Sequence, residues 1–140
     1  MRKSTVNPLT TLHHVPLFVD CTTKELRKIV ASGDEVSFKA GRTLIEEGQP
    51  GREAFIVLNG IVSVHRNGRR LTRLGAGSVV GELALLDDGP RTATVVCDTD
   101  VDLFVLNQRH FRHVLDEVPS LTRKLLTQLA GRVRDASKSV

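Results

Sequence analysis

The sequence predicts an α+β domain in which an antiparallel, jelly-roll-like barrel is flanked by helices at both ends of the chain. Apolar residues have helical spacing at the start, short alternating segments separated by turn residues fill the middle, and helical spacing returns at the end. A length of 140 residues suits one domain, and we find no internal repeat or linker. We therefore expect a single domain over residues 1–140, with helices in 1–34, the barrel in 35–106 and helices in 107–140.

Two helix starts are predicted in residues 1–34. Asn7-Pro8 has the form of an N-cap followed by proline at the first helical position. Apolar residues then recur at helical spacing up to the next proline. Thr22, with Glu25 three residues later, matches a capping box. Gly33 lies at the position of a helix C-terminal glycine.

The middle of the chain consists of short alternating runs bounded by glycine, asparagine and proline. Asn67-Gly68 between two such runs predicts a hairpin. Strands at this spacing indicate a sandwich or a jelly-roll barrel. The candidate strands are residues 36–38, 43–46, 54–58, 61–66, 69–74, 93–97 and 101–106.

Helical spacing returns with a short piece over residues 111–115 and a longer helix that starts at Pro119. One apolar stripe runs along the longer helix: Val118, Leu121, Leu125, Leu129, Val133 and Ala136. We expect the stripe to pack on the chain's own barrel, with a homodimer through this helix as the alternative.

Composition excludes several classes of protein. With 40% hydrophobic and 26% charged residues, the chain is neither a collagen nor a disordered tail. No run approaches the ~18 apolar residues of a membrane span. No apolar core follows the basic N-terminus, so we expect no signal peptide and a cytoplasmic location. The absence of Trp and Tyr argues against a nucleic-acid surface of stacked rings.

The net charge of +4 leaves DNA, RNA, an acidic surface or a small phosphate ligand open as partners. Cys21 and Cys97 form neither a CxxC nor a zinc-finger pattern, so we expect buried free thiols, with a disulfide or a redox pair as the alternative. An arginine cluster surrounds the predicted hairpin, and we expect it to be a solvated face: Arg66, Arg69, Arg70 and Arg73.

Residues 81–95, GELALLDDGPRTATV, have the chemistry of a ribose-phosphate site. The first half lacks β-branched residues, which predicts one helical turn starting near Gly81 with free N–H groups and a positive end that suit an anion. Arg91 supplies a planar fork of donors for two phosphate oxygens. Glu82 is an acceptor that a sugar hydroxyl would satisfy.

The GELALL and PRTATV runs resemble the phosphate-binding cassette of cyclic nucleotide-binding domains. That family includes the catabolite activator protein, the regulatory subunits of cyclic-nucleotide-dependent kinases and the gated channels. The resemblance covers nearly the whole chain, because the Val15-Pro16-Leu17-Phe18 entry, the glycine-punctuated strands and the final helix fall in family order. It implies a β-roll that takes cAMP, with cGMP as the alternative ligand, and no metal.

The resemblance also implies a role for each cassette residue. Glu82 accepts from the ribose 2′-hydroxyl. The backbone N–H groups of Leu83 and Ala84, with the Arg91 side chain, hold the cyclic phosphate. Thr92 bonds the phosphate or the 2-amino group of a syn guanine.

For the base, the resemblance implies aliphatic walls and the C-terminal helix. Val64, Leu71 and Leu74 match β-roll positions that wall the base. Ala136 and Ser137 fall where the bacterial activator touches adenine with Thr and Ser, so Ser137 remains a candidate contact.

Other interpretations of these residues stay open. A structural ion pair between Glu82 and Arg91 is the alternative for the cassette. His110 and His113 lie three apart with Glu117 one turn further on, which is the spacing of a helical metal face. Solvated polar faces are the interpretation that we favour for these histidines.

The resemblance implies a sensor. We also find no nucleophile–base pair in the sequence, so we do not expect an enzyme. The nucleotide would reposition the C-terminal helix and so signal to an unidentified downstream protein. We expect no direct DNA binding by this chain, since no recognition helix follows the apolar stripe. Two alternatives remain: the sensor half of a cAMP-responsive DNA-binding regulator lacking its helix-turn-helix part, and a ligand-free scaffold of the same fold.

Overall fold

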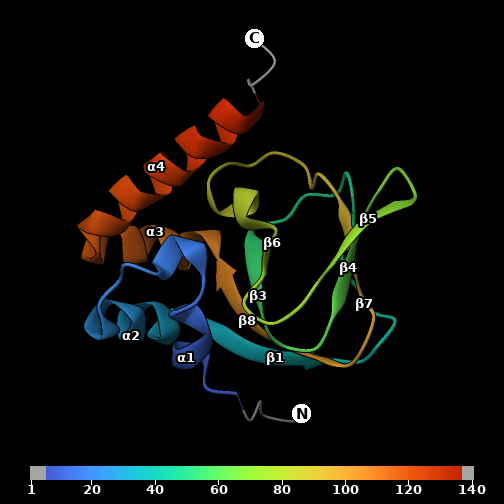
Figure 1. The fold of residues 1–140 in the computed structure, drawn as a ribbon, viewed down its shortest axis with the longest axis horizontal. Coiled ribbons are helices and arrows are strands. Elements are labelled where there is room, and N and C mark those ends of the chain that lie inside the picture. Colours follow the sequence, from blue (N-terminus) through green and yellow to red (C-terminus); the bar gives the residue numbers. More distant parts are fainter. Residues whose placement is uncertain (1–5, 137–140) are drawn as a thin grey trace.

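Two four-stranded antiparallel sheets form a β-roll with helices at both ends of the chain (Figure 1), as predicted. The computed structural model describes residues 6–136. The strand orders are β1-β8-β3-β6 and β2-β7-β4-β5. The strands are β1 (Asp34–Phe38), β2 (Thr43–Ile45), β3 (Glu53–Asn59), β4 (Val62–Arg66), β5 (Arg69–Leu74), β6 (Val79–Val80), β7 (Thr94–Cys97) and β8 (Val101–Asn107).

The predicted strands are confirmed within one or two residues, and one further strand, β6, was not predicted. Only two residues long, β6 has no alternating pattern to signal it. It is defined by its pairing with β3, in which Val80 pairs with Phe55 and Val79 with Ile56. This pairing depends on the tertiary structure.

Helices lie before the roll, within it and after it. Before it are α1 (Pro8–Leu12), the 3₁₀ turn η1 (Pro16–Phe18) and α2 (Thr23–Ala31). The 3₁₀ turn η2 (Glu82–Leu85) lies between β6 and β7. The chain continues from β8 into α3 (Gln108–Glu117) and α4 (Pro119–Ala136).

The predicted helix starts are confirmed by their caps. The Asn7 side chain accepts from the Leu9 N–H at 3.0 Å, and Thr22 and Glu25 form the reciprocal capping box at 2.8 and 3.1 Å. Two details differ from the prediction. The first helix ends at Leu12, before the predicted proline stop. Gly33 follows the Ser32 cap without a positive φ, and the Phe104 ring packs where its Cβ would lie.

Two apolar clusters hold the fold together. One joins the β1–β8–β3 sheet to the helices and includes Leu26, Phe104 and Phe111. The other fills the roll between the sheets and includes Val57 and Leu103. The first cluster fixes the helices to one side of the roll, which leaves the remainder of the roll open to a ligand.

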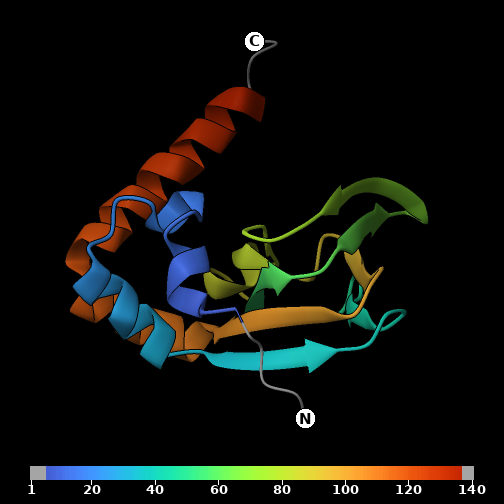
Figure 2. The ribbon, with the colours of Figure 1, turned by 60° about the horizontal axis from the view of Figure 1, so that its bottom comes forward.

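Burial along the apolar stripe decreases toward the end of α4. Val118 and Leu121 are fully buried, whereas Leu126 and Val133 are 62% and 65% exposed. Figure 2 shows α4 rising away from the sheets toward the C-terminus. The prediction that the apolar stripe packs on the roll is therefore wrong at Val133, whereas Leu125 and Leu129 of the stripe are partly buried. The side chain of Ala136 lies outside the described residues.

Candidate nucleotide-binding site

The predicted helical turn is present as η2, which leaves β6 through Gly81. Gly81 has a φ of 77°, a conformation that favours glycine. Its carbonyl accepts the Ala84 N–H at 3.1 Å, so the turn closes on itself. A Cβ on Gly81 would lie 2.7 Å from an Arg91 nitrogen. The glycine therefore serves both the turn and the approach of the arginine.

Arg91 lies against backbone oxygens at the mouth of the roll. Its Nη1 donates to the Glu53 carbonyl at 2.8 Å and to the Gly81 carbonyl at 3.4 Å. The main chain is fixed as well, because its N–H donates to the Gln49 carbonyl at 2.9 Å. Burial lowers the pKa of Arg91 and the charge of Glu53 raises it. A guanidinium stays charged at neutral pH, so the site holds a fixed cation that faces no carboxylate in direct contact.

Glu82 is paired with the C-terminal helix. Its Oε1 accepts from Arg132 Nη1 on α4 at 2.9 Å. The alternative of a structural Glu82–Arg91 ion pair is therefore wrong: Arg91 bonds to carbonyls and Glu82 to a different arginine. The cassette carboxylate thus links the site to α4.

A hollow of about 240 Å³ inside the roll collects most of the predicted site. Its wall includes six of the predicted residues: Val64, Leu74, Gly81, Glu82, Arg91 and Thr92. A second hollow of about 320 Å³ shares the four cassette residues of that set and adds Ala84. Cationic, carboxylate and hydroxyl side chains and an aliphatic wall therefore face the same space.

Of the remaining predicted residues, Ala84 lines only the second hollow and Leu71 lines neither. Leu71 is 52% exposed, so its assignment to the base wall stays a prediction. The pairing of β4 with β5 shifts there: Val64 faces Thr72 and His65 faces Arg70, which leaves Leu71 as the extra residue of a bulge. For Leu83 the structure describes only the backbone, which is part of η2. Ser137 lies outside the described residues.

Sequence reasoning missed two arginines of the site. Arg66 is exposed, as predicted for the arginine cluster, but it also lines the 240 Å³ hollow and donates from Nε to the Thr92 carbonyl at 3.0 Å. Arg132 reaches Glu82 from α4. Arg66 is the last residue of a predicted alternating strand, and this position was the feature of the sequence that could have indicated its place in the site. Arg132 had none, because its contact depends on how α4 is oriented.

The other candidate groups take different partners. His113 pairs with Glu117 at 2.9 Å, and a His110 ring nitrogen lies 3.1 Å from the Asn107 amide. Within residues 6–136 no three or more His, Cys, Asp or Glu side chains gather as metal ligands. Cys21 and Cys97 are free and buried, so the disulfide alternative is wrong, and burial raises the pKa of both thiols. No helix of the described chain has the length and apolarity to cross a membrane.

Sequence comparison finds a family model that matches most of the chain. A model described as "Cyclic nucleotide-binding domain" matches residues 35–118. The potassium/sodium hyperpolarization-activated cyclic nucleotide-gated channel 3 of Mus musculus is 35% identical over 89% of this chain and 16% of its own length. The cAMP-dependent protein kinase regulatory subunit of Aspergillus niger is 35% identical over 81% of this chain and 28% of its own length. The chain thus spans less than a third of these relatives.

Solved structures agree with the sequence match. The N-terminal domain of a transcriptional regulator from Streptomyces coelicolor A3(2) superposes with a TM-score of 0.82 at 34% identity, covering 93% of this chain and 94% of that domain. The catabolite activator protein of Thermus thermophilus superposes with a TM-score of 0.81 at 28% identity, covering 89% of this chain and 61% of that protein. These matches share the β-roll, and the sequence match includes the whole cassette. The chain belongs to the cyclic nucleotide-binding domain family.

Proposed function

We propose that this chain is a sensor that binds cAMP, with cGMP as the alternative ligand, in the hollow of the β-roll and signals through α4. The observation that supports this most is the convergence of Glu82, Arg91 and Thr92 on one hollow of about 240 Å³ walled by aliphatic side chains. A cyclic phosphate needs a cation, and a ribose hydroxyl needs an acceptor. Both are present, and the sensor needs no catalytic group.

The phosphate would replace weaker partners of Arg91. In this structure the guanidinium donates to two neutral carbonyls. A charged phosphate makes shorter and stronger bonds to the same donors. The Arg91 side chain and the Leu83 N–H would hold the phosphate. The Ala84 N–H would join them after leaving the Gly81 carbonyl that it bonds here.

The base would lie against Val64 and Leu74. Two polar groups lie near it on the wall of the hollow: the Thr92 hydroxyl and the Arg66 guanidinium. Arginine donates to the O6 and N7 atoms of guanine in a bidentate manner. A threonine hydroxyl can accept from the 2-amino group of guanine. These two groups make cGMP the second ligand to test.

The signal would pass through Glu82. The carboxylate has two oxygens: Arg132 on α4 takes Oε1, and the ribose 2′-hydroxyl would bond the group from the other side. A ligand that binds more tightly to one placement of α4 shifts the population toward it. The downstream protein remains to be identified, and a homodimer through α4 stays a prediction.

Isothermal titration calorimetry with cAMP and with cGMP tests the proposal. In the Arg91→Ala variant the phosphate would face an unfilled, dehydrated position, so we expect affinity to fall by about 30-fold to several thousand-fold, equivalent to about 2–5 kcal/mol. The control is Arg109→Ala, which removes an exposed arginine at the start of α3 and should bind as the unmodified chain does.

Thermal unfolding of each variant confirms that it is folded before its affinity is compared. Nucleotide in excess over its Kd must also raise the Tm of the unmodified chain. If neither nucleotide changes the Tm at millimolar concentration, the chain is a ligand-free scaffold and the proposal is wrong.

A further inference from the structure

The hairpin of β4 and β5 presents a basic surface at the free edge of the second sheet. Strand β5 is last in the strand order and has β4 as its only neighbour. Its first five residues are exposed. Figures 1 and 2 show the hairpin on the side of the roll away from the helices. We call this surface the arginine hairpin, and it consists of Arg66, Arg69, Arg70 and Arg73.

Most of the positive charge of the arginine hairpin is not balanced by a carboxylate. Arg73 pairs with Asp98, with 2.9 Å between its Nε and Oδ2. Arg66 donates only to a neutral carbonyl. Arg69 and Arg70 make no hydrogen bond or ion pair with the described residues. Two guanidinium groups near the turn therefore keep all their donors available.

The strand register places like charges opposite each other at the end of the hairpin. Arg66 and Arg69 are direct partners on the two sides of the turn, and Arg70 lies opposite His65. Like charges in directly opposite positions destabilise a strand pair. Local rules of this kind are broken mainly at functional sites. An anionic group bound between these side chains would remove the repulsion.

We propose that the arginine hairpin binds a short acidic segment of a partner protein. Guanidinium groups form bidentate pairs with carboxylates, and arginine clusters recognise acidic motifs in many peptide complexes. A second copy of this chain, placed edge to edge on β5, would bring arginine against arginine and be repelled. The partner is therefore a different protein with the opposite charge.

Carboxylates at both ends of the arginine hairpin favour a short acidic segment over a nucleic acid. Beside the turn, Glu47 accepts the Asn67 N–H at 3.0 Å. At the other end, Asp98 lies against Arg73. A nucleic-acid backbone is a continuous row of phosphates and would meet these carboxylates. A short acidic segment would contact only the arginines between them.

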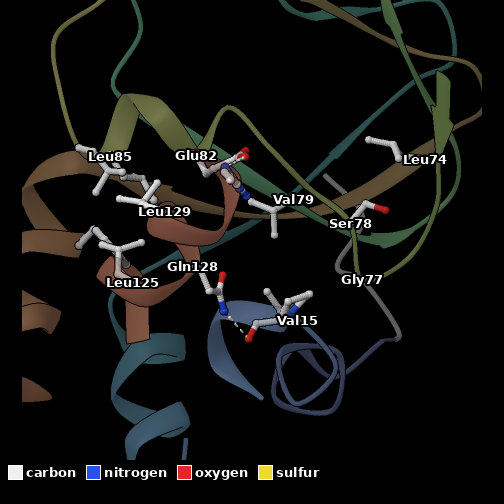
Figure 3. Close-up of a pocket in the computed structure, with 14 residues that line it drawn as sticks. Val15, Leu74, Gly77, Ser78, Val79, Glu82, Leu85, Leu125, Gln128 and Leu129 are labelled. Atoms are coloured by element: carbon white, nitrogen blue, oxygen red, sulfur yellow. Dashed lines mark hydrogen bonds and ion pairs between the residues drawn. The ribbon is translucent and has the colours of Figure 1, made fainter. Parts of the chain in front are cut away.

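The two unpaired arginines lie outside the nucleotide site. Arg69 and Arg70 line neither the hollow of the roll nor the apolar space beneath α4. That space, shown in Figure 3, shares Leu74 and Glu82 with the hollow and belongs to the nucleotide site. The proposal therefore does not depend on nucleotide binding.

An NMR titration of the ¹⁵N-labelled, unmodified chain with acetyl-hexaglutamate amide tests the proposal. We expect saturable shifts of the backbone amides of residues 66–73. The affinity should fall by about fivefold or more between about 50 mM and about 300 mM NaCl, because salt screens exposed charges. Shifts spread over all basic surfaces, or no shifts with millimolar peptide, would contradict the proposal. Tighter binding of hexathymidylate at the same amides would show a nucleic-acid surface and overturn it.

Two variants of equal net charge locate the peptide. Arg69→Glu combined with Arg70→Glu should weaken peptide binding by about tenfold or more, because attraction becomes repulsion. The control combines Arg109→Glu with Arg112→Glu, at two exposed arginines of α3, and should bind within about twofold of the unmodified chain. Equal losses in both variants would show that only net charge matters. Arg91→Ala should also keep its peptide affinity, and a loss there would place the peptide in the nucleotide hollow and contradict the proposal.

Discussion

Arg91 shows how a single side chain is prepared for an anion by its backbone surroundings. Two glycines make room for it: a Cβ on Gly51 would collide with the guanidinium, and one on Gly81 would lie 2.7 Å from it. Carbonyl oxygens satisfy its donors in the absence of a carboxylate. The arginine is therefore positioned and still has its charge available for a phosphate.

Thr92 is the residue whose substitution should distinguish the two nucleotides. It lines the same hollow as Arg91, so its hydroxyl can bond either the phosphate or a guanine amino group. If the hydroxyl contacts guanine, Thr92→Ala should weaken cGMP about fivefold or more and cAMP less, the loss of roughly one hydrogen bond. Calorimetry with both nucleotides measures this. Equal losses would show that the hydroxyl contacts only the phosphate.

Asp98 makes stability depend on pH. The Ser63 hydroxyl donates to its Oδ1 at 2.7 Å and Arg73 Nε to its Oδ2 at 2.9 Å. The Ser63 bond is the largest cause that lowers the pKa of Asp98, followed by Arg73, while burial acts in the opposite direction. Since the carboxylate is favoured in the folded state, its contribution is present above the unfolded pKa of about 3.9 and is lost as the pH falls through the lower folded value.

We therefore expect Asp98→Asn to be less stable than the unmodified chain at pH 7, with the difference disappearing toward pH 2. Urea unfolding at several pH values measures the free energy of unfolding. Asp116→Asn, at an exposed position on α3, is the control and should change this profile little. A difference that stays constant down to pH 2 would contradict the assignment.

The element that decides the proposed output is α4. Its first turns are buried beside α3, and its later turns are held by Gln128 and Arg132. Exposed ion pairs contribute about 0–1 kcal/mol, and here Arg132 and Glu82 are 57% and 32% exposed. A helix end held this weakly can respond to a ligand at Glu82.

Arg132→Ala should accordingly speed amide exchange in the last turns of α4 by up to about fivefold. The matched control is Arg134→Ala, an exposed arginine two residues along the same helix. Hydrogen exchange with mass spectrometry resolves both. Equal effects of the two substitutions would show that the Glu82 contact does not hold the helix.

At the scale of the whole molecule, the roll and the helices share one apolar cluster, and a separate cluster fills the roll. Helix α4 enters the shared cluster through Leu121 and leaves it before Leu126. The β-roll can therefore keep its shape while the end of α4 moves. In the proposed function, this division would let one small domain both hold a ligand and report it.

Leu121→Ala should lower the free energy of unfolding by about 2–5 kcal/mol, because it empties a fully buried position. Leu126→Ala, five residues along the same helix and 62% exposed, should change it by less than about 0.5 kcal/mol. Urea unfolding compares the two. A large effect of Leu126→Ala would mean that this face of α4 is covered in solution, as a homodimer would require.

The sequence by itself determined the order of the elements, the caps of α1 and α2, the hairpin and the cassette, because these depend on residues close together in the chain. Caps and turns are local hydrogen bonds, and alternation follows from the geometry of a strand. The pairing of β6, the bulge that turns Leu71 outward and the contact of Arg132 with Glu82 were decided by tertiary structure. Each of these features joins segments whose relative position cannot be predicted from a local sequence pattern. That position depends on how the sheets curve and where α4 crosses the roll.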